Sequence, residues 1–230
     1  MESIKELRKI CQEKGYQEHI TLRFYRIFSI YITKIFLIFK INPNIVSVLG
    51  FLMGIVGGYL YLNNQFLLGS ILFLIALILD FVDGEIARYC KLSSKFGAWL
   101  DTISAHLLYP YFFFTLGLGI FFQTGIFRYV FLGALAAIVK LIERSVPKIA
   151  IGDINHSLLK GQNVSSIKMW VGHIGKIMTL YPLVLFCSLM DWEKWFLWFF
   201  AIYLTLFTLG KVFLTGWRIY KQEKHYKNTK

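Results

Sequence analysis

The sequence predicts an all-α integral membrane protein: six transmembrane helices preceded by an N-terminal interfacial amphipathic helix, with both termini in the cytoplasm. Of the 230 residues, 57% are hydrophobic and 18% are aromatic, a composition that soluble domains rarely have. Several apolar stretches approach the roughly 20 residues that a helix needs to cross a bilayer. Basic residues are concentrated in alternate connections between these stretches, which is typical of multi-pass proteins.

The chain is interpreted as a single membrane domain over 1–230. It consists of an interfacial helical arm (1–43), a six-helix bundle (44–216) and a basic tail (217–230). The predicted spans of the bundle are 44–63, 66–83, 97–121, 126–142, 169–190 and 195–216. These limits follow from the apolar runs and the turns between them.

The distribution of charge predicts the orientation of the bundle. Of the 25 Lys and Arg residues, only Arg128 and Lys194 lie near the turns 63–65, 122–125 and 191–194. The positive-inside bias places the opposite side, with all the other cations, in the cytoplasm. We therefore expect a multi-pass protein of a bacterial or archaeal plasma membrane. The net charge of +12 then indicates contact with membrane lipid, and no nucleic-acid partner is expected.

The arm begins with polar residues and continues as "ITLRFYRIFSIYITKIFLIFK", in which cations interrupt the apolar run. This pattern predicts a helix in the membrane interface, with its cations near lipid phosphates, rather than a seventh span. The sequence "NPN" follows, in which Asn42 can cap a helix that has Pro43 at its first position.

Three carboxylates occur at the predicted cytoplasmic edge of the bundle. Asp80 and Asp83 are three residues apart at the end of the second span, so on a helix they lie on nearly one face. Asp101 is near the beginning of the third span. If these helices pack side by side, the carboxylates can hold a hard divalent cation such as Mg²⁺ or Mn²⁺. The alternative is that each aspartate marks a helix end or pairs with a nearby cation.

Small and basic residues accompany the aspartates. Gly84 and Ala87 lie on the same helix face, and Gly97 lies one turn before the third aspartate. Small residues let a ligand approach closely, although they also let membrane helices pack together. Arg88 can contact a phosphate or act as an ordinary anchor on the cytoplasmic side.

Together these residues resemble the signature of the CDP-alcohol phosphotransferase family. The matching positions are Asp80, Asp83, Gly84, Ala87, Arg88, Gly97 and Asp101. The resemblance covers nearly the whole chain, with an interfacial helix, a "PN" before the first span and six spans. It implies an enzyme of phospholipid synthesis that transfers a phosphoalcohol or phosphatidyl group from a CDP-linked donor to an alcohol acceptor and releases CMP.

The resemblance also implies ligands and partners. Asp80, Asp83 and Asp101 would hold two Mg²⁺ or Mn²⁺ ions against the pyrophosphate of CDP-diacylglycerol or of a CDP-linked small alcohol. The site would face the cytoplasm, and the family commonly forms homodimers. The residues expected around the nucleotide and its phosphates are Gly84, Ala87, Arg88, Gly97 and, as weaker candidates, Asn44 and Ser47.

One position departs from the family pattern. Ala105 occupies the place of a fourth aspartate, which is generally taken as the base that deprotonates the acceptor hydroxyl. His106 follows, and an imidazole suits base catalysis near neutral pH, but it projects about 100° around the helix from residue 105. His106 and Asp101 are therefore the candidate catalytic residues. The alternative for His106 is a hydrogen bond between helices.

Ala105 leaves three explanations open. The base can have moved to His106 or to another group, the chain can be an Asp→Ala variant made to trap a complex, or it can be a family member that binds nucleotide or lipid without turnover. Two further classes are a prenyltransferase, which usually has more spans and differently spaced acids, and a transporter. Clustering of the acids at one membrane edge argues against a transporter.

The acceptor side is less defined. Cations that an anionic acceptor, such as a sugar phosphate or glycerol phosphate, can use are Arg144, Lys148, Lys160, Lys168 and Lys176. Contact with anionic lipids explains these residues equally well. The polar stretch 152–168 is a candidate loop over the mouth of the site.

Overall fold

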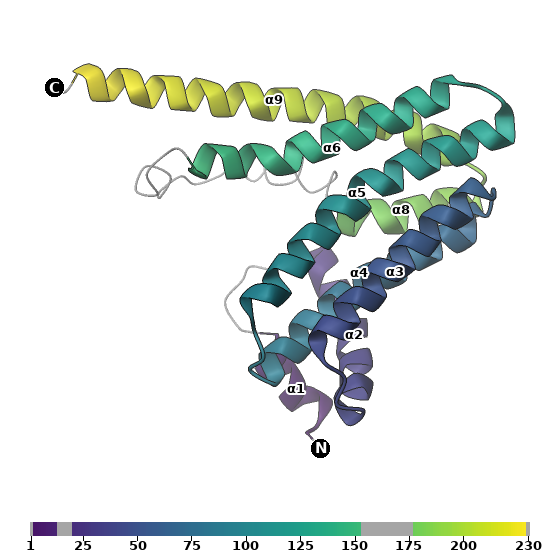
Figure 1. Ribbon diagram of the computed structural model, residues 1–230, viewed down its shortest axis with the longest axis vertical. Coiled ribbons are helices and arrows are strands. Elements are labelled where there is room, and N and C mark those ends of the chain that lie inside the picture. Colours follow the sequence, from purple (N-terminus) through teal and green to yellow (C-terminus); the bar gives the residue numbers. More distant parts are fainter. Residues whose placement is uncertain (1, 13–19, 153–176, 229–230) are drawn as a thin grey trace.

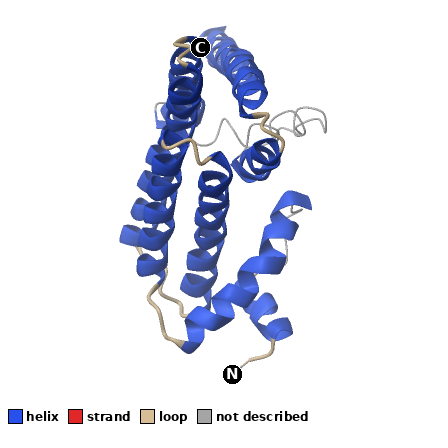
Figure 2. Cartoon of the chain, turned by 90° about the vertical axis from the view of Figure 1, so that its right-hand side faces the viewer, coloured by secondary structure: helices blue, strands red, loops and turns tan. Residues whose placement is uncertain are grey.

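The structure, a computed structural model, describes residues 2–12, 20–152 and 177–228, and these ranges contain helices, turns and loops but no strand (Figure 2). The predicted all-α class is therefore confirmed. The helices are α1 (Ile4–Cys11), α2 (Ile20–Ile38), α3 (Pro43–Leu62), α4 (Phe66–Tyr89), α5 (Lys95–Thr124), α6 (Arg128–Gly152), α8 (Ile177–Leu189) and α9 (Glu193–Asn228).

Within the described ranges, the four helices α3, α4, α5 and α9 are long and apolar enough to cross a membrane. Each overlaps a predicted span, although α4 continues as far as Tyr89. The predicted span 126–142 falls within α6. The predicted span 169–190 begins outside the described residues, and its end forms the shorter apolar helix α8. The number of six spans therefore stays a prediction, as does the orientation of the termini.

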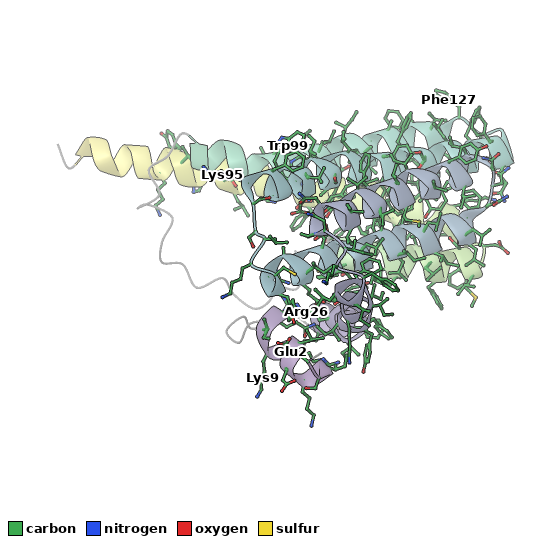
Figure 3. The ribbon with its side chains drawn as sticks, turned by 60° about the horizontal axis from the view of Figure 1, so that its bottom comes forward. Glu2, Lys9, Arg26, Lys95, Trp99 and Phe127 are labelled. Atoms are coloured by element: carbon green, nitrogen blue, oxygen red, sulfur yellow. The ribbon has the colours of Figure 1, made fainter. Side chains whose placement is uncertain are left out.

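Helix α4 lies at the centre of the helical arrangement. It packs against α3, α2, α8 and α1, while α5 packs against α3 and α6, and α6 packs against α9. Figure 1 shows this order from α9 and α6 at the top to α1 and α2 at the bottom. In Figure 3, Lys95 marks the first residue of α5, and Phe127 marks the turn between the opposite end of α5 and the start of α6.

Aromatic side chains fill the middle of the bundle. Tyr61, Phe73, Phe112 and Tyr181 come from four different helices and are almost completely buried. The rings of Phe73 and Phe112 meet edge to face with centroids 5.0 Å apart, a favoured geometry for aromatic pairs. These contacts join α3, α4, α5 and α8 around one core.

A chain of hydroxyl groups links three helices beside this core. The Tyr61 hydroxyl lies 2.9 Å from Ser70 Oγ, which in turn lies 3.0 Å from Ser188 Oγ. All three side chains are buried, so the hydrogen bonds satisfy groups that would otherwise be costly to remove from water.

Helices α5 and α6 touch through their backbones. A Cβ atom on Gly117 would lie 2.5 Å from the Tyr129 carbonyl oxygen and 2.8 Å from the Gly133 Cα. No other residue fits there without moving one of the helices, because the obstructing atoms belong to the main chain.

Short polar residues begin the two helices that border the candidate site. The Asn42 side chain accepts a hydrogen bond of 2.9 Å from the Asn44 amide, with Pro43 in the first helical position, as the sequence predicts. The Ser94 hydroxyl accepts a hydrogen bond of 3.0 Å from the Gly97 amide at the start of α5. Both caps lie at the end of the bundle that contains the aspartates.

Helix α2 of the arm has two different faces. Ser29, Ile30 and Thr33 are buried against the rest of the protein, while Phe28 and Tyr31 belong to a row of exposed apolar residues. An exposed apolar face of this kind suits a helix in the membrane interface. The location of the arm in that interface remains a prediction.

Candidate functional site

The three predicted aspartates converge on one region of the structure. Asp80 and Asp83 come from α4 and Asp101 comes from the first turns of α5. The carboxyl groups of Asp80 and Asp101 lie within hydrogen-bonding reach of each other. The Ser47 hydroxyl, on α3, donates a hydrogen bond to Asp83 Oδ2.

The carboxylates converge although the helices that contain them do not pack side by side, which was the condition under which their convergence was expected. Both α4 and α5 pack extensively against α3 and only slightly against each other. A short connection, in which Lys91 adopts a left-handed φ of 54°, links the end of α4 to the Ser94 cap of α5. The aspartates therefore lie beside the beginning of α3, which contributes Asn44 and Ser47 to the same cavity.

Two adjoining cavities share these aspartates. The larger one, called the outer cavity, has a volume of about 310 Å³. The smaller one, called the inner cavity, has a volume of about 40 Å³ and extends toward Tyr181 in the aromatic core. The predicted site residues that line the outer cavity are Asn44, Ser47, Asp80, Asp83, Gly84, Ala87, Arg88, Gly97 and Asp101.

The two predicted glycines of the outer cavity are sterically constrained. A Cβ atom on Gly97 would lie 3.1 Å from Asn44 Oδ1 and 3.2 Å from Ser94 Oγ. A Cβ atom on Gly84 would lie 3.3 Å from Arg88 Nη1. Glycine therefore keeps the polar atoms of the wall close together while leaving the cavity open.

Three small residues of the outer cavity, Ser93, Ser94 and Ala98, were not predicted from the sequence. Their position between the aspartates of α4 and α5, together with the Ser94 capping pattern, is the signal that could have identified them. They extend the wall of small and polar groups along the connection into α5.

Ala105 and His106 point into different surroundings. Ala105 lines the inner cavity together with all three aspartates. His106 lines neither cavity, because its ring faces Arg144 on α6, whose Nε lies 3.1 Å from His106 Nδ1. The structure thus does not bring His106 to the aspartates and instead places it in a hydrogen bond between two helices.

The same ring nitrogen has a second neighbour. His106 Nδ1 lies 2.7 Å from the Thr102 carbonyl oxygen. It can accept from Arg144 only when it has no proton, and it can donate to Thr102 only when it has one. The two interactions exclude each other, so the proton position of His106 determines whether the α5–α6 hydrogen bond forms.

Arg144 is the predicted acceptor-side cation that the structure places near the site. Its guanidinium lies 4.7 Å from the centre of the Tyr109 ring, and Tyr109 lines the inner cavity. The other predicted cations, Lys148, Lys160, Lys168 and Lys176, and most of the candidate loop 152–168 lie outside the residues whose side chains are described.

A partly buried ion cluster, not predicted from the sequence, lies next to Arg144. Glu143 Oε2 lies 2.7 Å from Lys140 Nζ, and Glu143 Oε1 lies 3.2 Å from Lys211 Nζ. The Lys211 ammonium also donates to the Glu143 main-chain oxygen at 3.0 Å. These contacts join α6 to α9 and fix the backbone next to Arg144.

The aspartate cluster provides a suitable donor set for a hard divalent ion. Its donors are carboxylate oxygens, and two carboxyl groups in close contact repel unless a proton or cation lies between them. Within the described part of the chain, no three ligating side chains already surround a single point.

Comparison with known proteins identifies the class to which this fold and site belong. Residues 40–217 match the family described as CDP-alcohol phosphatidyltransferase. The match covers most of the chain, which therefore belongs to this family. Together with the apolar helices, family membership defines an integral membrane protein and confirms the resemblance noted in the sequence.

Curated relatives match over a short segment of the chain. A bifunctional IPC transferase and DIPP synthase of Aquifex aeolicus is 42% identical over 69 residues, which are 30% of this chain and 16% of that protein. An archaetidylinositol phosphate synthase of Pyrococcus horikoshii is 43% identical over 63 residues, which are 27% of this chain and 33% of that protein. The chain thus spans at most a third of the length of these relatives.

Solved structures are similar over a larger part of the chain. Phosphatidylinositol phosphate synthase of Mycobacterium tuberculosis with CDP-DAG bound has a TM-score of 0.59 and 17% identity, covering 83% of this chain and 94% of that chain. The same protein with manganese and citrate has a TM-score of 0.60 and 19% identity, covering 82% and 88%. At this identity the similarity shows a shared fold.

Proposed function

We propose that this chain is a metal-dependent enzyme that transfers a phosphatidyl or phosphoalcohol group from a CDP-linked donor to an alcohol acceptor, with release of CMP, in phospholipid synthesis. One observation carries the proposal. All seven signature positions, from Asp80 to Asp101, line the same outer cavity. Residues that only capped helices or filled packing contacts would have no reason to share one polar cavity.

The three aspartates are the proposed metal ligands. Bound Mg²⁺ or Mn²⁺ would neutralise charge on the donor pyrophosphate and on the departing CMP. The residues of the chain then have two tasks, to hold the carboxylates in place and to orient the donor. The Ser47 hydroxyl performs the first task for Asp83. The solved structure with manganese and citrate supports the use of a divalent metal in this fold.

The outer cavity is the proposed place of the CDP part of the donor. Gly84, Ala87 and Gly97 leave room for it, and Arg88 supplies a cation at the wall. Asn44 accompanies them on the α3 side. The solved structure that contains CDP-DAG supports CDP-diacylglycerol as the first donor to test, before CDP-linked small alcohols.

The acceptor is proposed to approach from the side of the inner cavity. Arg144, stacked on Tyr109, is a cation there that favours an acceptor with a phosphate group. The names of the relatives, which refer to inositol phosphate products, support the same class. A site facing the cytoplasm and a homodimer are further proposals, which rest on the charge distribution and the family resemblance.

Ala105 supports a second candidate function, that of a CDP- or lipid-binding protein without turnover. Ala105 borders the inner cavity and has no group that can accept a proton. His106, the proposed replacement base, is bonded toward Arg144, so it must rotate to reach an acceptor hydroxyl. A missing base can remove turnover without removing metal or nucleotide binding.

Release of CMP by the purified protein in lipid tests these alternatives. The reaction contains Mg²⁺ or Mn²⁺, CDP-diacylglycerol and either neutral alcohols or their phosphates, and a parallel set contains CDP-linked small alcohols with lipid acceptors. Activity that is lost in His106→Ala supports a relocated base. Activity that appears only in Ala105→Asp supports a disabled enzyme. Metal-dependent CDP binding without release in any variant supports the binding protein, and absence of both contradicts the proposal.

A further inference from the structure

A buried acid that the signature does not include lies on the far side of α4. The side chain of Glu85 is fully buried, with 0% exposure. Five residues separate it from Asp80, which places it about 140° around the helix from that aspartate. Helix α4 therefore presents the aspartates to the cavities on one side and Glu85 to the N-terminal arm on another.

Three hydrogen bonds join Glu85 to the arm. Glu85 Oε1 accepts from Ser29 Oγ at 2.7 Å and from Gln12 Nε2 at 2.9 Å. Glu85 Oε2 accepts from Thr33 Oγ1 at 2.7 Å. The donors come from α2 and from the residue that follows α1. Gln12 Nε2 also donates to the Arg26 carbonyl oxygen at 3.0 Å, so the end of α1 is bound to α2 and α4 together.

This arrangement is demanding for a buried carboxyl group. Its removal from water is costly unless its oxygens receive hydrogen bonds, and bonds to a charged acceptor are stronger than bonds between neutral groups. The three side chains that donate hydrogen bonds to Glu85 are neutral. Each can therefore be replaced singly without leaving an unpaired charge in the arm.

The arm also contacts a residue of the outer cavity. Arg88, one turn after Gly84, donates from Nε to the Cys11 carbonyl oxygen at 2.6 Å, and Arg88 lines the outer cavity. A guanidinium has two further nitrogens in the same plane. Because Nε is bonded to the arm, the hydrogen bond restricts the orientation of the guanidinium plane in the wall of the outer cavity.

We infer that Glu85 is a positioning residue for the donor: it anchors the arm to α4, so that the carbonyl of Cys11 holds the Arg88 guanidinium toward the phosphates in the outer cavity. The arm then forms part of the donor site as well as a membrane contact. The phosphate part of this inference rests on the proposed function, whereas the anchoring of α1 by Glu85 does not.

The main test is Glu85→Gln in the full-length protein. The amide keeps the shape of the side chain but removes its charge, so its hydrogen bonds to Ser29, Thr33 and Gln12 become bonds between neutral groups and are weaker. We expect the KM for CDP-diacylglycerol and the Kd for CDP with Mg²⁺ to rise about tenfold, with kcat nearly unchanged. Amide hydrogen exchange in residues 4–12 should accelerate in the same variant.

Thr33→Val provides a milder variant if Glu85→Gln does not fold, since valine has the shape of threonine and removes one donor only. Ser70→Ala is the matched control, because Ser70 is a buried hydroxyl on the same helix, bonded at its opposite end. The control should lose stability without changing the KM for the donor or the exchange of residues 4–12.

A double-mutant cycle shows whether Glu85 acts through Arg88. Arg88→Lys keeps the positive charge but loses the planar fork. If Glu85 positions this fork, the fold increase in the KM for CDP-diacylglycerol in the double variant is much smaller than the product of the fold increases in the two single variants. Multiplying effects, or an unchanged KM in folded Glu85→Gln and Thr33→Val, would overturn the inference.

The two proposals can fail separately. A wild-type protein that neither binds CDP nor releases CMP contradicts the proposed function and the phosphate part of the inference. Faster exchange in residues 4–12 of Glu85→Gln would still support the anchor. Conversely, an active wild type with unchanged exchange and KM in Glu85→Gln contradicts the inference alone.

Discussion

The two ends of α4 are built in opposite ways. Near Ser70, the helix is surrounded by buried rings and by hydroxyl groups that bond to one another. Near Asp80 and Asp83, it borders two cavities, and its carboxyl groups face other carboxyl groups. The closed end is satisfied by the protein alone, whereas the open end is best satisfied by a ligand. Stability and ligand binding should therefore respond to different substitutions along one helix.

The largest expected effect breaks the open end. Asp83→Asn removes one negative ligand while keeping shape, so metal-dependent CMP release should fall by at least about a thousandfold. The thermal midpoint should not fall, because loss of a carboxylate from a like-charged cluster relieves repulsion. Initial rates over a range of Mn²⁺ concentrations measure the effect. Wild-type rates in this variant would remove Asp83 from the proposed site.

The next effect breaks the closed part of the fold. Gly117→Ala forces a methyl group against the backbone of α6, so we expect a loss of about 3 kcal/mol in the free energy of unfolding, at the upper end for overpacking. The matched control is Gly210→Ala on α9, where a Cβ atom would meet nothing within 4 Å. The measurement is the free energy of unfolding of both variants in detergent. Equal stability of the two variants would contradict the close contact between α5 and α6.

A smaller effect sharpens the comparison along α4 itself. Ser70→Ala removes a hydroxyl that links Tyr61 to Ser188 and leaves two buried groups with one partner fewer, which should cost about 1–3 kcal/mol. The donor KM should not change. Equilibrium unfolding and steady-state kinetics on the same preparation measure both quantities. A raised donor KM would show that the two ends of α4 are not independent.

The smallest expected effect concerns the wall of the outer cavity. Gly97→Ala places a methyl group 3.1 Å from Asn44 Oδ1, a distance that side-chain movement can relieve. We expect the donor KM to rise by roughly threefold to tenfold, equivalent to about 1 kcal/mol, with little change in stability. Titration with CDP in the presence of Mg²⁺ is the measurement. A larger effect on stability than on affinity would make Gly97 a packing residue.

The features that could be predicted from the sequence are those that depend on residues close together in the chain, namely helix caps and the faces of single helices. Asn42 and Pro43 predict the start of α3 because capping depends on neighbouring residues. The signature residues predict a shared cavity because their spacing on a helix determines which face they occupy.

Features that depend on helices distant in sequence could not be predicted in the same way. The position of α3 between α4 and α5 is a result of packing, and no spacing within either helix reveals it. His106 was expected on a different face from Ala105, but its contact with Arg144 needs α6 to be in position. The role of Glu85 cannot be predicted from the residues around it, because its three partners lie in the arm.

The position of Glu85 in the sequence means that it is synthesised after all three of its hydrogen-bond partners in the arm. Its partners Gln12, Ser29 and Thr33 precede it by 73, 56 and 52 residues. At translation rates of about 5–20 residues per second, the arm exists for roughly 3–15 seconds before Glu85 is made. The acid therefore emerges from the ribosome with all of its donors already synthesised, and the arm can receive it as α4 enters the membrane.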